Sequence, residues 1–557
     1  MSDQDSSLAL GSPRFSDTRL SGMATEKGAP AAWREAWIAH GMRAASGVSG
    51  DFAVGLRDGN GRTFLAVDRF AIRTLCYRVD QGKLRFAARA DELADTGTAI
   101  DPQAIFDYLY FHVIPSPRTI YKGIYRLPPG HCAVFENGTL TVEPYWVPTF
   151  EEQRDPSFAT LKDEFRQLLK NAVATQLDGS KPACFLSGGT DSSTVAGMLG
   201  LASGKTAATY SIGFDAQGYD EMEYARLAAR HFKTEHHEYY VTPDDLVKSI
   251  ADVAASYDQP FGNSSALPAY YCAKMAREDG VSKILAGDGG DELFGGNTRY
   301  AKQKVFGWYE SVPGALRSGL MEPVSSLSIM DKIPLVKKAA SYVNQAKVPM
   351  PDRLMTYNLL FRLGVEDMLT PQLLAQVDQQ DPAHQQRGVW NEAHADSLVN
   401  RMLAFDWRYT LADCDLPKVV GTTALAGVGV GFPMLDDQLL AFSLKLPTAY
   451  KLKGFKLRWF FKEALRGFLP DEILTKKKQG FGLPFGVWAN GHPALKALAT
   501  ESLNSLARRG VVRADFVQTL LTQRLPEHPG YYGEMVWILM MLEQWLAAKA
   551  PEFTMPG

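Results

Sequence analysis

The hydrophobic pattern in the central part of the chain alternates between two periods. Apolar residues recur at helical spacing over residues 157–177, with charged residues between them, which predicts an amphipathic helix. Beyond it, short apolar runs alternate with longer segments of helical spacing. The runs that predict strands are 182–186, 208–214, 238–241 and 283–286, and the segments that predict helices are 194–201, 220–232, 246–257 and 266–278. This alternation is typical of an α/β fold, in which helices cover both faces of a parallel sheet.

The first part of the chain has a different pattern, in which short strand-like runs are joined by turns. The turn sequences are Asp58-Gly59-Asn60-Gly61, Asp80-Gln81-Gly82-Lys83 and Glu136-Asn137-Gly138. Each predicts a β-hairpin, so we expect a small β-rich domain over residues 31–150, with a short helix at 32–42. Residues 1–30 are rich in Ser, Gly, Ala and Asp without periodicity, which predicts a mobile tail. A larger domain, mostly helical from about residue 300 to 470, covers residues 151–557.

Composition narrows the class of protein. The 557 residues suffice for two or more domains, and 46% hydrophobic with 22% charged residues is ordinary for a soluble globular protein. A net charge of −3 gives no reason to expect nucleic-acid binding, and no apolar run is long enough to span a membrane. The five cysteines are scattered without a Cys-x-x-Cys pair, which argues against disulfides or zinc and predicts a reducing, cytoplasmic location.

The segment after the run 182–186 carries the strongest chemical signal. It reads Ser187-Gly188-Gly189-Thr190-Asp191-Ser192-Ser193 and leads into a predicted helix. Glycines allow backbone N–H groups to approach an oxyanion, and a helix start adds positive potential, so we expect an anion site. An aspartate beside phosphates needs a cation between them, so Asp191 indicates Mg²⁺. The segment is not a Walker loop, which requires Gly-x-x-x-x-Gly-Lys-Ser/Thr.

A second glycine-rich segment follows the run 283–286 and reads Gly287-Asp288-Gly289-Gly290-Asp291-Glu292. A helix N-cap explains one of its three acids but not all of them. Asp191 and Asp291 lie at the ends of separate predicted strands, and together they make good ligands for an Mg²⁺ ion that bridges phosphates.

A third segment reads Lys476-Lys477-Lys478-Gln479-Gly480-Phe481-Gly482-Leu483-Pro484. Three lysines alone are typical of a solvated surface. The glycine-aromatic-glycine-proline sequence after them indicates a defined loop instead, in which a fixed cation would stabilise charge that develops on a phosphate.

These three segments resemble the signatures of the asparagine synthetase superfamily, whose ATP pyrophosphatase (PP-loop) members split ATP between the α and β phosphates and adenylate an oxygen. The resemblance covers roughly residues 50 to 545 and implies a PP-loop parallel sheet, ATP as co-substrate and Mg²⁺. It implies that Asp191 and Asp291 bind the metal, and that Lys478, over the α-phosphate, and Asp288 are catalytic. It implies that the ATP-binding residues are Leu186, Ser187, Gly188, Gly189, Asp191, Ser192, Ile212, Ala286 and Gly287.

The first domain resembles the last part of that family's glutaminase domain, which has an Ntn-hydrolase-like fold. The matching segments are Gly50-Asp51-Phe52-Ala53, Asp68-Arg69-Phe70 and Leu127-Pro128-Pro129-Gly130-His131. The family's nucleophile is an N-terminal cysteine, whereas residue 2 here is Ser2 and the first cysteine is Cys76, inside a predicted strand. The family's glutamine-holding segments also have no counterpart before Gly50. We therefore expect a truncated domain without glutaminase activity.

A further family segment is altered. Four positions that are charged in asparagine synthetases, near the acceptor pocket or its supporting residues, are Val420, Gly421, Gly429 and Gly431 here. Asp288 stands where asparagine synthetases carry Glu or Asp and β-lactam synthetases carry Tyr, which argues against β-lactam closure. The lost charges put aspartate in doubt as the acceptor.

The sequence therefore predicts an ATP-dependent carbon–nitrogen ligase that joins a small-molecule or peptide carboxylate to an amine or ammonia. One alternative is ring closure within a substrate, as in lasso-peptide cyclases or β-lactam synthetases. Another is a non-catalytic regulator that binds ATP, against which the intact Asp191, Asp291 and Lys478 count. The oligomeric state stays open, a homodimer or an assembly with a partner protein included.

Overall fold

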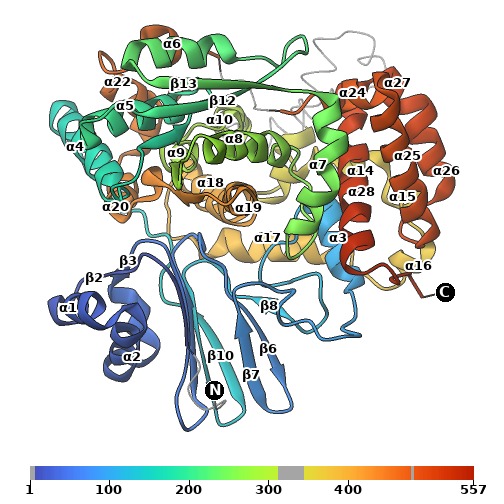
Figure 1. The fold of residues 1–557 in the computed structure, drawn as a ribbon, viewed down its shortest axis with the longest axis horizontal. Helices are drawn as coiled ribbons and strands as arrows, with labels where there is room; N and C mark the ends of the chain where they lie inside the picture. Colours follow the sequence, from blue (N-terminus) through green and yellow to red (C-terminus); the bar gives the residue numbers. More distant parts are fainter. Residues whose placement is uncertain (1–6, 311–343, 478–481, 557) are drawn as a thin grey trace.

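The computed structural model describes residues 7–310, 344–477 and 482–556. Figure 1 shows an antiparallel β domain at the bottom and a larger α/β part above it, with a stack of carboxy-terminal helices at the right. The predicted fold class, a parallel sheet with helices preceded by a β-rich domain, is confirmed. Lys478 lies outside the described residues.

The β domain is built on a five-stranded antiparallel sheet in the order β1-β4-β5-β9-β10. Its strands are β1 Ser7–Gly11, β4 Phe52–Arg57, β5 Thr63–Val67, β9 His131–Glu136 and β10 Thr139–Pro144. A smaller sheet contains β6 Cys76–Asp80, β7 Lys83–Ala87 and β8 Tyr125–Arg126. The three predicted hairpins are confirmed as the antiparallel pairs β4–β5, β6–β7 and β9–β10. Successive side chains of β4 alternate between faces, so that Phe52 packs with Trp33 while Ala53 packs with Leu75.

The prediction of a mobile tail is wrong for residues 7–30. β1 pairs with β4, with Ser7 opposite Leu56, and two helices follow, α1 Thr18–Lys27 and α2 Ala29–His40. Asp17 caps α1, since its Oδ1 accepts the N–H groups of Arg19 at 2.8 Å and Leu20 at 3.1 Å. An edge strand of five residues gains its stability from its partner strand, so composition alone could not reveal it.

The second part contains a five-stranded sheet in the order β13-β12-β11-β14-β15, in which every pair is parallel. Its strands are β11 Ala183–Phe185, β12 Ala208–Phe214, β13 Glu235–Val241, β14 Lys283–Leu285 and β15 Gly429–Gly431. The associated helices are α4 Phe158–Ala174, α5 Thr190–Ser203, α6 Met222–Phe232, α7 Pro243–Ser256, α8 Ala266–Glu278 and α9 Gly290–Phe294. After β11, the next two strands, β12 and β13, extend the sheet on one side of β11. The following two, β14 and β15, extend it on the other side. Ligands of open α/β sheets bind at such a reversal, outside the carboxyl ends of the strands.

In the part of the chain that the structure describes beyond residue 297, most residues are helical, as the sequence predicted for about 300 to 470; residues 311–343 of that region lie outside the described residues. The helices of this part include α10 Thr298–Glu310, α17 Asp381–Glu392, α18 Leu398–Asp406, α19 Leu416–Ala426, α20 Asp437–Lys445, α22 Trp459–Ala464, α24 Phe485–Gly491, α25 Pro493–Arg508 and α28 Pro529–Lys549. Helix α28 packs against α7, α24 and α25 and is buried on most sides, with Trp537 and Trp545 almost inaccessible.

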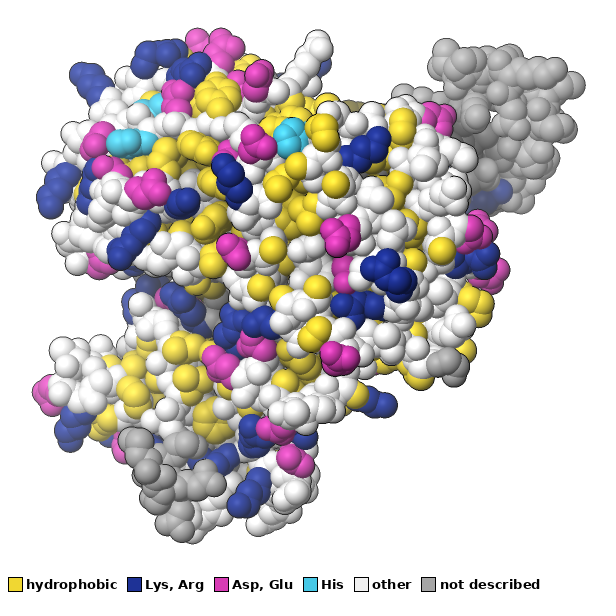
Figure 2. All heavy atoms as spheres, turned by 45° about the vertical axis from the view of Figure 1, so that its right-hand side comes forward, with side chains coloured by type: hydrophobic (Ala, Val, Ile, Leu, Met, Phe, Trp, Pro, Cys, Tyr) yellow, Lys and Arg dark blue, Asp and Glu magenta, His cyan; other side chains and the backbone are white. Residues whose placement is uncertain are grey.

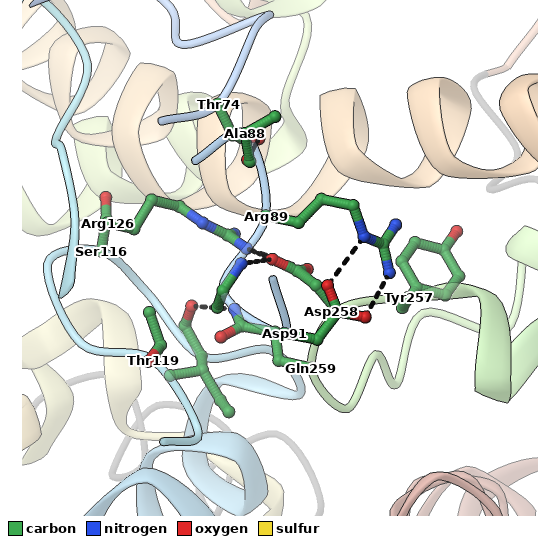
Figure 3. Close-up of polar contacts among 12 residues, drawn as sticks. Thr74, Ala88, Arg89, Asp91, Ser116, Thr119, Arg126, Tyr257, Asp258 and Gln259 are labelled. Carbon is green, nitrogen blue, oxygen red and sulfur yellow. Dashed lines mark hydrogen bonds and ion pairs between the residues drawn. The ribbon is translucent and has the colours of Figure 1, made fainter. Parts of the chain in front are cut away.

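A buried ion pair joins the β domain to the second part (Figure 3). Nη2 of Arg126, on β8, lies 3.0 Å from Oδ1 and 2.8 Å from Oδ2 of Asp258, which follows α7. The Ala90 N–H donates to the same carboxylate at 2.9 Å. Burial raises the pKa of Asp258, but Arg126 and the Ala90 N–H outweigh it, so the pKa lies below its ordinary value. A carboxylate that stays charged thus ties the two parts together.

Candidate active site

The loop between β11 and α5 has the form of an anion cradle. Gly188 has a φ of +74°, and a Cβ there would lie 2.5 Å from the backbone N of Ala225, so only glycine fits. The Oγ atoms of Ser187 and Ser192 lie 3.0 Å apart, and the Ser187 N–H donates to Ser192 Oγ at 3.1 Å. Gly189 is the N-cap residue of α5, and no described side chain caps this helix. Its first N–H groups are therefore left for water or an anion.

The segment after β14 lies directly against this loop. β11 and β14 are neighbours in the sheet, with Cys184 opposite Leu285. A Cβ at Gly287 would lie 2.9 Å from the backbone N of Ser192, and one at Gly290 would lie 2.0 Å from Oδ1 of Asp191. Glycine at both positions lets the two segments touch, so the structure brings together the first two of the three segments that the sequence singled out.

Asp191 and Asp291 converge on the guanidinium of Arg458, which precedes α22. Nη1 of Arg458 lies 2.6 Å from Asp191 Oδ2 and 2.7 Å from Asp291 Oδ1, and Nη2 also contacts Asp191. The guanidinium donates to Thr190 Oγ1 at 3.0 Å and lies 3.8 Å from the centre of the Phe461 ring. Burial lowers the pKa of Arg458, but the carboxylates outweigh it and raise the pKa, so the side chain stays charged. In this structure a guanidinium therefore lies between the two carboxylates for which the sequence predicted Mg²⁺.

The two carboxylates nevertheless have the chemistry of a metal site. Oxygens of both reach one point, because both contact the same nitrogen of Arg458. Hard carboxylate oxygens are the ligands that Mg²⁺ prefers. Asp191 and Asp291 are therefore the residues that would hold such an ion.

Sequence reasoning missed Arg458, which lies 267 residues from Asp191 and 167 from Asp291. It follows a small hairpin of β16 Leu452–Lys453 and β17 Lys456–Leu457. The signal in the sequence is a cluster of lysines and an arginine over 451–458, which by itself is typical of solvated surface.

A small pocket, with a cavity volume of about 10 Å³, opens beside the loop. It is lined by Leu186, Ser187, Ser211, Ile212, Tyr219, Glu221, Met222 and Ala225. The structure therefore places Leu186 and Ile212, which were predicted to bind ATP, in one cavity with Ser187. Ala286 is fully buried at the end of β14 and does not line this pocket.

Asp288 does not join the Arg458 cluster in the contacts of the described residues but lies near Lys418 of α19. Nζ of Lys418 is 3.5 Å from Asp288 and 2.9 Å from Asp415. Burial raises the pKa of Asp288, although Lys418 acts in the opposite direction. Lys418 was not singled out in the sequence because a single lysine within a helical segment carries no motif.

Neutral side chains fill the space beside two of the altered glycines. A Cβ at Gly421 would lie 2.5 Å from the ring of Tyr257, and one at Gly431 would lie 2.6 Å from Oε1 of Gln176. Restoring a long charged side chain at either position would require these neighbours to move. At these two positions, the space that a charged side chain would need is thus occupied by Tyr257 and Gln176.

The basic run before residue 478 divides into two kinds of lysine. Lys476 binds Glu221 of the pocket lining at 2.8 Å and lies 4.3 Å from the centre of the Tyr224 ring, whereas Lys477 is exposed. The lysines are therefore not equivalent, and Lys477 is the suitable control for Lys478.

Neither cysteine of the β domain is suited to act as a nucleophile. Cys76 and Cys132 are buried, and burial raises the pKa of Cys76 to about 12 and that of Cys132 to about 11. A thiol is reactive as the thiolate, so these two are inert at neutral pH.

A second group of potential metal ligands lies at the amino end of the parallel sheet. Ligand atoms of Glu235, His237 and Asp279 lie within 4.8 Å of one another. Nζ of Lys181 already contacts both carboxylates, at 3.2 and 2.6 Å, and this ammonium opposes the binding of another cation. We assign the group no metal.

Comparison with known proteins places this arrangement in a family. The asparagine synthase family matches residues 164–547, and the glutamine amidotransferase domain matches residues 34–146. The chain belongs to the asparagine synthase family, and its fold and family define it as a ligase-type enzyme.

Three relatives illustrate the range of similar proteins. Asparagine synthetase [glutamine-hydrolyzing] 1 of Bacillus subtilis is 24% identical, covering 92% of this chain and 80% of its own length. A putative asparagine synthetase [glutamine-hydrolyzing] of Mycobacterium tuberculosis is 23% identical, covering 88% and 75%. Amidase chyE of Penicillium rubens is 25% identical, covering 84% and 75%.

Two further observations concern partners. Among the described residues, none of the helices has the length and apolar character needed to cross a membrane. On the face shown in Figure 2, basic and acidic side chains are interspersed, without a broad patch of one sign. The expectation that nucleic acid is not a partner remains a prediction.

Proposed function

We propose that this protein joins a carboxylate to an amine or to ammonia through an acyl-adenylate. A carboxylate oxygen attacks the α-phosphorus of ATP and pyrophosphate leaves. The nitrogen then attacks the carbonyl carbon, loses a proton, and AMP departs with the former carboxylate oxygen. The observation that carries the proposal is the convergence of the Ser187–Ser193 loop, Asp191 and Asp291 at the reversal of the sheet.

ATP and Mg²⁺ are the proposed co-substrate and metal. The loop N–H groups and the hydroxyls of Ser187 and Ser192 would bind the phosphates, and the pocket beside Ile212 would hold the adenine. Asp191 and Asp291 would hold Mg²⁺, and that ion would supply positive charge to neutralise the leaving pyrophosphate. Asp288, close to Lys418, is our candidate for the group that meets the attacking nitrogen.

The acceptor is proposed to be a small-molecule or peptide carboxylate other than free aspartate. Support comes from the neutral packing of Tyr257 and Gln176 against Gly421 and Gly431. Pyrophosphate release from ATP with a pool of candidate acids, with and without added ammonia, tests the proposal. Release that needs an acid supports ligation, release without added amine indicates closure within one substrate, and ATP binding without release indicates a regulator.

Glutamine alone is expected not to serve as nitrogen donor. Purified protein should release no glutamate from glutamine above background, because the thiols of Cys76 and Cys132 are buried and protonated. The Ser2→Ala variant should behave identically. Glutamate release that disappears in Ser2→Ala would contradict this prediction.

Lys478→Ala is expected to lower turnover by about 10²–10³ while ATP affinity changes less, because a cation at the α-phosphate acts where charge develops. Lys478→Arg should restore turnover only in part, since a planar guanidinium does not replace a compact ammonium. Turnover and ATP affinity are measured beside those of Lys477→Ala, an exposed neighbour. Small and equal losses in both alanine variants would mean that Lys478 has no catalytic part.

A further inference from the structure

The guanidinium of Arg458 occupies the point where the proposed metal would bind. One of its nitrogens contacts both Asp191 and Asp291, at 2.6 and 2.7 Å. Two cations within about 4 Å of each other in a partly buried site repel by several kcal/mol. The metal and the guanidinium therefore cannot share these oxygens, and one must yield to the other.

The contact between Arg458 and the carboxylates is closely fitted. A Cβ at Gly290 would lie 2.0 Å from Asp191 Oδ1, and one at Gly296 would lie 1.7 Å from Asp291 Oδ1, so both carboxylates sit against bare backbone. The whole of Arg458 is 3% exposed. The two half-buried carboxylates repel each other, and the guanidinium between them offsets that repulsion.

Arg458 also shows features of a residue held under constraint. Its φ is +53°, in the left-handed region that is uncommon for residues other than glycine. Its Nε has no hydrogen-bond partner among the described residues. Such local costs occur where surrounding interactions impose them, and here the carboxylates hold the outer nitrogens.

We propose that Arg458 is the built-in counter-ion of the metal carboxylates, and that it competes with the divalent cation for Asp191 and Asp291. In the protein without ligands, Arg458 holds the two carboxylates in place. When ATP and metal arrive together, the phosphates offer the displaced guanidinium a new partner. The metal alone therefore binds weakly, and ATP and metal raise each other's affinity. This inference rests on the proposed metal site.

Binding of Mn²⁺ in the absence of nucleotide, followed by electron paramagnetic resonance, tests the competition. Suppose that the Arg458 guanidinium is displaced from the carboxylates in about 10% or less of the molecules. Removing the side chain should then tighten Mn²⁺ binding about tenfold or more. We therefore expect Arg458→Met to bind Mn²⁺ at least that much more tightly than the wild type. The Mn²⁺ affinity of Arg458→Lys should lie between those of the wild type and Arg458→Met, because one ammonium cannot reproduce the two-nitrogen contact of the guanidinium. The control is Arg466→Met, on an exposed arginine paired with Glu463 and Asp471.

Each outcome decides between the possibilities. Unchanged or weaker Mn²⁺ binding in Arg458→Met, with binding that still needs Asp191 and Asp291, would overturn the competition and leave the metal site intact. No Mn²⁺ binding in any variant, with or without ATP, would overturn the metal site itself. If Arg458→Met does not fold alone, Mn²⁺ should restore its thermal unfolding transition, and failure of this rescue would also overturn the inference.

Discussion

Replacing Asp191 or Asp291 by asparagine is expected to lower pyrophosphate release by about 10²–10³ or more, because each change removes a carboxylate from the proposed metal site. The fold should survive. Arg458 keeps the remaining carboxylate as a partner in either variant, so its charge is not left unpaired. The measurements are pyrophosphate release and thermal unfolding of both variants beside the wild type.

Asp163→Asn supplies the matched control, since Asp163 is an exposed residue of α4. Its pyrophosphate release and its unfolding temperature should equal those of the wild type. Unchanged release in either Asp191→Asn or Asp291→Asn would reject the metal assignment. Lost release together with a collapsed unfolding transition would show that the residue acts on the fold instead.

Arg126→Met is expected to lower the free energy of unfolding by about 3–5 kcal/mol, because it leaves the buried Asp258 carboxylate without its cation. The pair lies between the β domain and the second part, so the variant should also be cut more rapidly by proteases between them. Denaturant titration measures the free energy. Arg85→Met is the control, because Arg85 and Asp95 form an exposed pair whose loss should leave the free energy of unfolding nearly unchanged.

The pH dependence of this effect has a defined sign. The pKa of Asp258 in the folded wild type lies below its unfolded value, so its contribution is present above the unfolded pKa of about 3.9 and is lost as pH falls through the folded pKa. In Arg126→Met the unpaired carboxyl is easier to bury when protonated. The stability gap between the two proteins should therefore shrink as pH falls from 7 to 4. A gap that stays constant over this range would contradict the assignment.

The fold could be predicted well where a single segment carries its own signal. The limits of β12 and α8 coincide with the predicted runs, because strong turns or polar breaks bound them on both sides. The hairpins followed from their turn residues. β1, by contrast, forms only by pairing with β4. The paired residues Ser7 and Leu56 are more than forty residues apart in the sequence, so the segment of β1 carries no signal of its own.

The candidate site divides in the same way. Its glycine-rich loops were visible because backbone approach and helix starts demand particular residues at adjacent positions. Arg458 and Lys418 meet their partners across more than a hundred residues. A single basic residue has no spacing pattern, so only the folded chain shows which carboxylates it meets.

Oxygen transfer from substrate to AMP tests the central claim most directly. A responsive acid labelled with ¹⁸O in its carboxylate is incubated with ATP, Mg²⁺ and the amine, and the products are analysed by mass spectrometry. The account predicts AMP that carries one ¹⁸O, with unlabelled pyrophosphate and an amide that retains the other labelled oxygen. Label in inorganic phosphate with release of ADP, or an amide formed without label in AMP, would contradict it.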